Sequence, residues 1–340
     1  MTHAPLLTFR PEGIYCARGG FYIDPWRAVS RAVITHGHAD HARSGMGHYL
    51  CTDIAAPVMR HRLGDIALDT LPYGETRDIN GVTLSFHPAG HVPGSAQVRV
   101  AYKGEIWAVS GDYKLEDDGL STAFEPITCQ HFITESTFGL PVFNWAPQTQ
   151  VAAELNAWWQ SCAATGKTAM LGAYSLGKAQ RLLRMLGDHG PILTHGAVEA
   201  TNTVLRAQGL PLPDTVQVTP DLNVKDHPGA IVLAPPSALG AAWVQRFGAR
   251  ETGFASGWMA LRGIRRRRAG DRGFVISDHA DWPGLLQAIR LSKAENIYVT
   301  HGYTEIFTRY LNEAGWNAQI VQTEFGTDDD DNDSDDDVAA

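Results

Sequence analysis

The stretch Thr35-His36-Gly37-His38-Ala39-Asp40-His41 carries more chemical information than any other part of this chain. It places three imidazoles and one carboxylate within six positions, directly after the apolar run Ala32-Val33-Ile34. Neutral imidazole and carboxylate are ligands that zinc and manganese prefer, and packing alone does not require four of them so close together. Since His36 and His38 are two positions apart, they would share one side of an extended loop, and Asp40 and His41 would follow on the next turn. The segment is therefore predicted to serve two adjacent metals.

Length and composition are those of a soluble protein. The 340 residues suffice for two domains, or for one large domain that carries an insertion. No stretch approaches the length of a transmembrane helix, and residues 1–10 lack the order of a signal peptide. The four cysteines are scattered without a CxxC pair, so neither a disulfide framework nor a Cys-rich zinc site is predicted. We therefore expect a protein of the reducing cytoplasm.

Charge is unevenly distributed along the chain. The formal net charge is −9, but eight aspartates lie within Asp328–Asp337, so the remainder is close to neutral. This run is predicted to be a disordered acidic tail, which either solubilises the protein, competes for a nucleic-acid groove or docks a basic partner. Conversely, Arg262, Arg265–Arg268 and Arg272 form a dense basic patch. It is either a solvated loop or a surface that attracts a phosphate backbone.

Short apolar runs typical of buried strands precede most of the chemically suggestive residues. Ile106–Val109 precedes Asp112, Phe132-Ile133 precedes Glu135, and Phe274–Ile276 precedes His279. Ile297–Val299 likewise precedes Thr300-His301-Gly302. Functional residues at strand ends are the usual arrangement of layered α/β proteins, so we expect these side chains to gather at one edge.

The middle of the chain has a different texture. Helical patterns cover Thr149–Cys162, Leu176–Leu186 and Ala197–Gln208, and no HxH cluster occurs there. We therefore expect a metal-binding domain interrupted by an inserted helical or α/β cap. The predicted boundaries are 1–145 and 272–326 for the metal-binding domain, 146–271 for the cap and 327–340 for the tail. A further helix is expected over Ile306–Ala314 and a strand over Ala318–Thr323.

A site for two metals needs ligands beyond the first segment. His91 lies among the glycines and prolines of residues 88–95, which provide the turn that a ligand loop needs. Asp112 follows a strand, where a carboxylate can bridge two cations. Alone it would be interpreted as a turn residue, but after the histidine segment and His91 it is predicted to be a ligand.

The ordered residues resemble a known ligand set. His36-x-His38-x-Asp40-His41, then His91, then Asp112, resembles the ligands of the metallo-β-lactamase superfamily. Three later motifs resemble those of the β-CASP nucleases within it: Glu135 in Thr-Glu-Ser-Thr, His279 in Ser-Asp-His-Ala-Asp and His301 in Thr-His-Gly. Residues 22–26, 71–75 and 134–141 are similar to the bacterial ligase-associated DNA exonuclease family. The resemblance covers residues 7–325.

The resemblance implies an α/β protein, namely a metallo-β-lactamase αββα sandwich with an inserted β-CASP-like cap. It also implies two divalent metal ions, zinc or manganese. One metal pocket would contain His36, His38 and His91, the other Asp40, His41 and His301, with Asp112 bridging. The implied catalytic residues are Asp40, with its metal, His279 as the general acid beside the scissile group, and Glu135, which would orient an imidazole.

The implied activity is phosphodiester hydrolysis by a hydroxide that bridges two metals, acting on single-stranded DNA ends in repair. A ligase and a helicase are the implied functional partners. The alternative is a β-CASP ribonuclease of RNA processing, because Artemis-like DNA nucleases have valine at the third motif whereas this chain has His301. A small-molecule hydrolase would not need the cap or the arginine cluster, and a silent binding module would be expected to have lost ligands.

Substrate contacts are expected from two loops of the cap. Gly172–Lys178 precedes a predicted helix, so its backbone amides with Ser175 and Lys178 would hold a phosphate, unless it is an ordinary serine-capped helix. Ser256 lies in the small-residue loop Thr252–Trp258, whose tryptophan either stacks on a base or belongs to the core.

Overall fold

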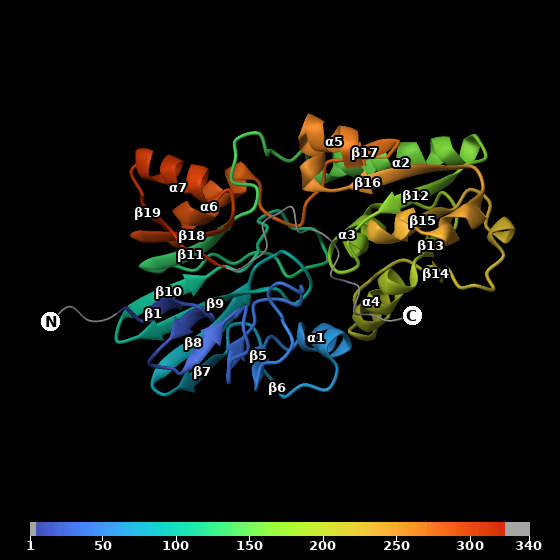
Figure 1. Cartoon of the computed structure of the whole chain (residues 1–340). Coiled ribbons are helices and arrows are strands. Elements are labelled where there is room, and N and C mark those ends of the chain that lie inside the picture. Colours follow the sequence, from blue (N-terminus) through green and yellow to red (C-terminus); the bar gives the residue numbers. More distant parts are fainter. Residues whose placement is uncertain (1–4, 269, 324–340) are drawn as a thin grey trace. The chain divides into compact units, whose positions relative to one another are not determined.

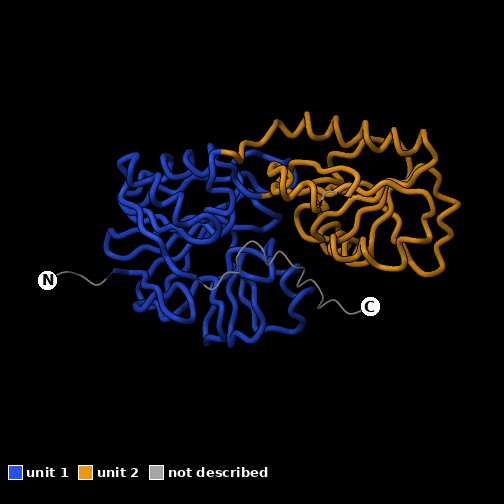
Figure 2. The backbone as a smooth tube through the Cα atoms, turned by 45° about the horizontal axis from the view of Figure 1, so that its top comes forward, with its two compact units in different colours: residues 1–141, 279–331 blue, residues 142–278, 332–340 orange. Residues whose placement is uncertain are grey.

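The computed structural model describes residues 5–268 and 270–323, which form two compact units. Unit 1 contains the described residues up to Pro141 and again from His279, and unit 2 contains residues 142–278. Both are shown in Figures 1 and 2, where unit 1 is blue in the second view and unit 2 orange. Unit 1 is thus built from both ends of the chain and unit 2 from its middle. The predicted acidic tail lies outside the described residues.

Unit 1 is built on two sheets. The first has strand order β1-β2-β3-β4-β5-β6, and the second has order β19-β18-β11-β10-β9-β8-β7. The second is mixed, because β7 to β10 pair antiparallel while β10, β11, β18 and β19 pair parallel. The strands of the first sheet are β1 (Leu7–Arg10), β2 (Gly13–Cys16), β3 (Phe21–Ile23), β4 (Ala32–Val33), β5 (Tyr49–Cys51) and β6 (Leu68–Thr70). Those of the second are β7 (Thr76–Ile79), β8 (Val82–Pro88), β9 (Ala96–Tyr102), β10 (Glu105–Val109), β11 (His131–Ser136), β18 (Asn296–Gly302) and β19 (Asn317–Ile320).

Helices cover the outer face of each sheet of unit 1. Helix α1 (Ala56–Leu63) packs on the first sheet, while α6 (Trp282–Ser292) and α7 (Thr304–Glu313) pack on the second (Figure 1). Residues alternate accordingly along β10, where Trp107 belongs to the core between the sheets and Ala108 to the core beneath the helices. Both faces of the strand are therefore buried, and the predicted αββα sandwich is confirmed.

Unit 2 is also an α/β structure. Its six strands pair in parallel throughout, in the order β14-β13-β15-β12-β16-β17. Of the two predicted kinds of insertion, helical and α/β, unit 2 is the α/β kind. The strands are β12 (Thr168–Gly172), β13 (Ile192–Thr194), β14 (Val216–Gln217), β15 (Ile231–Ala234), β16 (Arg250–Ala255) and β17 (Arg272–Phe274). The helices are α2 (Gln148–Ala164), α3 (Lys178–Met185), α4 (Gly196–Ala207) and α5 (Arg262–Arg268), with short 3-10 turns between β14 and α5.

None of the helices in residues 5–268 and 270–323 is long and apolar enough to cross a membrane.

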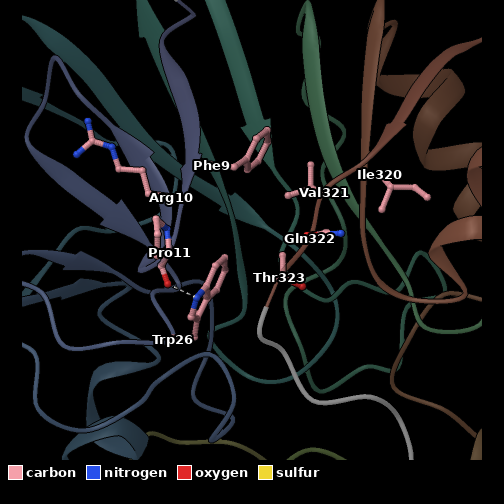
Figure 3. Close-up of a pocket in the computed structure, with 8 residues that line it drawn as sticks. All are labelled: Phe9, Arg10, Pro11, Trp26, Ile320, Val321, Gln322 and Thr323. Atoms are coloured by element: carbon pink, nitrogen blue, oxygen red, sulfur yellow. Dashed lines mark hydrogen bonds between the residues drawn. The ribbon is translucent and has the colours of Figure 1, made fainter.

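A hollow of about 480 Å³ lies in unit 1 beside the end of β1 and the segment after β19 (Figure 3). Its lining contains no histidine, aspartate or glutamate, so it is not a metal site. The residues that line it are Phe9, Arg10, Pro11, Trp26, Ile320, Val321, Gln322 and Thr323.

Candidate metal centre

The predicted ligands are positioned at the ends of strands from both sheets of unit 1. The segment from His36 to His41 follows β4, His91 follows β8 and Asp112 follows β10. The apolar runs Phe132-Ile133 and Ile297–Val299 lie within longer strands, because β11 runs on to Ser136 and β18 to Gly302. Glu135 and His301 therefore lie within the last residues of their strands, where parallel pairing continues across a register shift.

A glycine allows two of the ligand loops to meet. Gly111 has φ +55, and a Cβ placed on it would lie 2.7 Å from the Cβ of Thr35. Only glycine permits both this conformation and this approach without displacing its neighbour. Because Gly111 precedes Asp112 and Thr35 precedes His36, this contact brings the carboxylate to the histidine segment.

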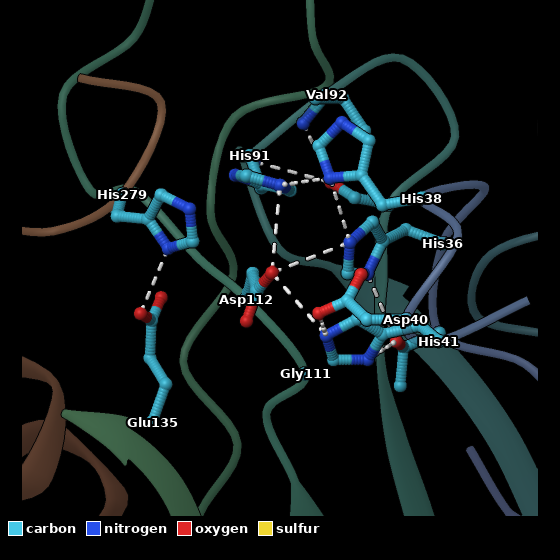
Figure 4. A network of polar contacts seen from close by, with 12 residues as sticks. His36, His38, Asp40, His41, His91, Val92, Gly111, Asp112, Glu135 and His279 are labelled. Atoms are coloured by element: carbon cyan, nitrogen blue, oxygen red, sulfur yellow. Dashed lines mark hydrogen bonds and ion pairs between the residues drawn. The ribbon is translucent and has the colours of Figure 1, made fainter. Parts of the chain in front are cut away.

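Five predicted ligands lie close together around Asp112. Asp112 Oδ2 lies 3.3 Å from His36 Nε2, 3.3 Å from His41 Nε2 and 3.7 Å from His91 Nε2 (Figure 4). His38 Nδ1 lies 3.1 Å from the Nε2 atoms of both His36 and His91. One donor atom from each of His36, His38, His91 and Asp112 lies within 4.8 Å of the others. Three imidazoles and a carboxylate with converging donor atoms fit a divalent metal ion.

The ligands predicted for a second pocket lie beside this cluster. Asp40 Oδ2 is 3.4 Å from His41 Nε2, the same nitrogen that faces Asp112. The ring centroid of His301 is 6.3 Å from that of His41, whereas the ring centroid of His36 is 4.2 Å from it. His301 has φ +55, which is uncommon for a residue other than glycine and directs the chain sharply at this point. All of these residues belong to unit 1.

The electrostatics of the cluster favour neutral imidazoles at His36 and His91 and an ionised carboxylate at Asp112. Burial alone would lower the pKa of His41, but Asp40, Asp112 and Asp24 raise it well above its usual value. Burial, helped by His41, lowers the pKa of His36 to about 4, and burial together with His279 lowers the pKa of His91 well below its usual value. Burial alone would raise the pKa of Asp112, but His41 and His279 hold it well below its usual range. Neutral imidazole and ionised carboxylate are the forms that bind a metal.

Glu135 and His279 form a pair on the other side of Asp112. His279 Nδ1 lies 2.8 Å from Glu135 Oε2 (Figure 4). Glu135 Oε1 accepts a hydrogen bond of 2.8 Å from the backbone of Tyr113. Because a carboxylate only accepts, Nδ1 of His279 carries the proton. The His279 ring is 4.6 Å from that of His91, between centroids. Donor atoms of Asp112, Glu135 and His279 also lie within 4.8 Å of one another.

Asp24 was not predicted as a site residue, although it lies in the segment 22–26 that carries part of the family resemblance. It is 2 % exposed, and its Oδ2 lies 2.8 Å from His41 Nδ1. The same carboxylate accepts hydrogen bonds from the backbone and hydroxyl of Thr35, whose oxygen lies 3.0 Å from His36 Nδ1. Asp24 therefore fixes the ring orientation of two predicted ligands, directly for His41 and through Thr35 for His36.

Replacing Asp24 with Asn is expected to weaken metal binding about 10–100-fold, the usual effect of losing an outer-sphere partner. Asn tolerates the positive φ of 41° at this position, so the backbone is not penalised. Calorimetric titration of the metal-free protein would measure the affinity. Asp65→Asn, at an exposed position, is the control. Unchanged affinity in the Asp24 variant would contradict the orienting role.

The three residues predicted to bind substrate lie in unit 2 and are buried there. Lys178 Nζ is 3.6 Å from Asp278 Oδ2, and Ser256 accepts a hydrogen bond from the backbone of Trp258. The side-chain oxygen of Ser175 has no hydrogen-bond partner among the described residues. Ser175, Lys178 and Ser256 are 6 %, 5 % and 2 % exposed. A phosphate contact from these residues therefore stays a prediction.

Comparison with known proteins connects the chain to two groups of enzymes. No family model matches it. It is 30 % identical over 321 residues to a "Probable DNA ligase" of Opitutus terrae, a match that covers 91 % of this chain. It is 31 % identical over 124 residues to "Endoribonuclease YSH1" of Eremothecium gossypii and 29 % identical to that of Saccharomyces cerevisiae, each over 36 % of this chain.

These relatives are much longer than the matched regions. The chain spans 30 % of the length of the ligase and 16 % of the length of each endoribonuclease. The fold is shared with a crystal structure of an Enterococcus faecalis protein of unknown function, with a TM-score of 0.58 and 10 % identity. That likeness covers 87 % of this chain and 80 % of the other, and it concerns the fold alone.

Proposed function

The chain belongs to the β-CASP group of the metallo-β-lactamase superfamily, and we propose that it is a two-metal nuclease that shortens single-stranded DNA from an end. The observation that carries the proposal is the position of Asp112. One of its oxygens faces nitrogens of His36, His41 and His91 at 3.3–3.7 Å. A single carboxylate shared by both predicted ligand groups is what a pair of neighbouring cations requires.

The ligands divide into two pockets in this proposal. His36, His38 and His91 would hold one ion, and Asp40, His41 and His301 the other, with Asp112 between them. When bound, two such ions activate a water for attack on phosphorus and neutralise the phosphoryl oxygens. Zinc and manganese both suit this donor set.

The remaining residues would handle the leaving group. Glu135 binds the Nδ1 proton of His279, which leaves Nε2 to exchange a proton with a substrate oxygen. His279 is the proposed general acid that protonates the leaving alkoxide, a role that contributes about 10²–10⁴-fold in rate. Glu135 is a positioning residue in this scheme, and Asp40 contributes through its metal.

Similarity to a protein named as a ligase supports DNA as the substrate. That match extends over 91 % of this chain, whereas each endoribonuclease match covers 36 %. Because a region of the ligase resembles 91 % of this chain, we propose that the two activities act together on DNA ends in repair, in the cytoplasm. The inserted unit 2 is proposed to be the β-CASP cap, and a helicase is proposed as a further functional partner.

RNA processing is the second candidate function. The endoribonuclease relatives support it. His301 supports it as well, because the family resemblance implies a histidine at the third motif in the RNA-processing members. The two candidates differ in the sugar of the strand and in whether cleavage begins at an end.

The test compares matched strands in one assay. Metal-stripped protein is incubated with end-labelled single-stranded DNA and with RNA of the same sequence, after addition of Mn²⁺ or Zn²⁺. We expect stepwise shortening of the DNA alone, and the labelled end gives the polarity. RNA cleavage with intact DNA would overturn the proposal in favour of the second candidate. Asp112→Asn protein prepared in parallel reveals any contaminating nuclease.

A further inference from the structure

Helix α5 of unit 2 presents a row of arginines to solvent. Arg265 and Arg266 lie three and four residues after Arg262, so all three project from one side of the helix, and all are exposed. Ile264, which is half-buried, projects from the other side. We call Arg262, Arg265 and Arg266 the arginine face of α5. Residues Arg262–Arg268, for which a solvated loop was one of two predictions, form a helix instead.

Helix α5 accounts for the positive net charge of residues 142–278. Residues 142–278 contain fourteen lysines and arginines against nine aspartates and glutamates. Five of the fourteen belong to α5. Without that helix the remaining nine basic residues would balance the nine acids, so the whole positive excess of unit 2 is concentrated in two helical turns.

Interactions within the protein do not explain this concentration. Among the described residues, the side chains of the arginine face make no ion pair or side-chain hydrogen bond. The acids nearest in sequence are used elsewhere: Asp271 accepts a hydrogen bond from the backbone of Thr252, and Glu251 binds Trp158. The helix dipole favours cations only in the last turn, whereas Arg262 is the first residue of α5. Like charges at this spacing also repel each other and weaken the helix.

We propose that the arginine face of α5 binds the phosphate backbone of a nucleic-acid strand. The proposal rests on the proposed function and adds to it the surface that holds the strand. Guanidinium groups bind phosphate through two parallel hydrogen bonds and stay charged at every physiological pH, and each residue of the face is arginine rather than lysine. Contacts to phosphate hold a strand without reading its bases, so the face sets affinity and salt dependence and leaves the chemical step unchanged.

The experiment measures strand binding and chemistry separately. Binding of a fluorescent single-stranded phosphorothioate DNA, which resists cleavage, is followed at several salt concentrations for the metal-loaded protein and for R262A/R265A/R266A. Each phosphate contact contributes a slope of about 0.7 in log affinity against log salt, so the slope should become shallower by about two. Hydrolysis of a small nitrophenyl phosphodiester should stay unchanged, which also reports that the variant is folded.

Two further variants complete the design. R18A/R31A/R309A removes three exposed arginines of unit 1 and should leave the salt slope close to that of the wild type. R262K/R265K/R266K keeps the charge and should restore the slope. An unchanged slope in the alanine variant, or a lysine variant as impaired as the alanine one, would overturn the proposal. Stronger strand binding by the alanine variant would also overturn the proposal. It would indicate that the arginine face binds the acidic segment Asp328–Asp337 of this chain instead of a nucleic-acid strand. If the wild type binds the strand but hydrolyses no phosphodiester, the proposed function fails while this inference stands.

Discussion

Replacing Asp112 with Asn should abolish hydrolysis and lower the metal content of the protein. The Oδ2 atom of Asp112 faces both His36 and His41 at 3.3 Å, so losing its charge weakens both proposed metal pockets at once. The charge stabilisation that metals provide in such reactions amounts to several kcal/mol, which corresponds to a loss in rate of about 10³-fold or more. Initial rates on end-labelled DNA and metal content by mass spectrometry would measure the two effects.

The Asp112 variant needs a control for general effects of removing a carboxylate. Asp65→Asn changes an exposed side chain of unit 1 that makes no contact with the cluster, and it should keep full activity and full metal content. Near-normal hydrolysis by Asp112→Asn would remove the shared-carboxylate mechanism. Loss of hydrolysis with both metals still bound would restrict the role of Asp112 to the reaction itself.

His279→Ala should slow cleavage of DNA by about 10²–10⁴-fold, the usual contribution of a general acid. Metal content should stay unchanged, because His279 Nδ1 binds Glu135 and the predicted ligands are other residues. A nitrophenolate leaving group needs no proton, so the same variant should hydrolyse a nitrophenyl phosphodiester almost normally. The comparison of the two substrates identifies the proton-transfer role.

The same measurements can refute the role of His279. Donor atoms of Asp112, Glu135 and His279 lie within 4.8 Å, so a metal held by His279 is a definite alternative. In that case His279→Ala would lose metal, and both substrates would be affected equally. His61→Ala, at an exposed position in α1, is the matched histidine control.

The sequence was sufficient to predict the sandwich and the gathering of the ligands. Four histidine and aspartate side chains in one loop have few explanations other than metal binding, and His91 and Asp112 follow strands of one sheet. Helices α2, α3 and α4 of unit 2 were also predicted within a few residues, for example Thr149–Cys162 against the observed Gln148–Ala164, whereas α5 was not predicted. The ligand segment and these helices depend on local patterns, which a single sequence displays, whereas the sandwich was predicted from the family resemblance of the motifs.

What the sequence did not reveal depends on contacts between distant segments. Asp24 reaches His41 across 17 positions, and nothing near it in sequence indicates a partner. The parallel sheet of unit 2 was not predicted because strands such as Ile231–Ala234 are buried throughout and lack alternation. The burial of Ser175, and of Lys178 at the start of α3, likewise arises from tertiary packing, which the local sequence does not display.

The central claim is that the cluster around Asp112 holds two divalent ions that act together. The most direct test adds Mn²⁺ in steps to the metal-free protein while the rate of DNA hydrolysis is measured. We expect little activity until the first equivalent is bound, a rise during the second and a plateau at two ions per chain. Full activity at one equivalent, or hydrolysis that persists without metal, would contradict the claim.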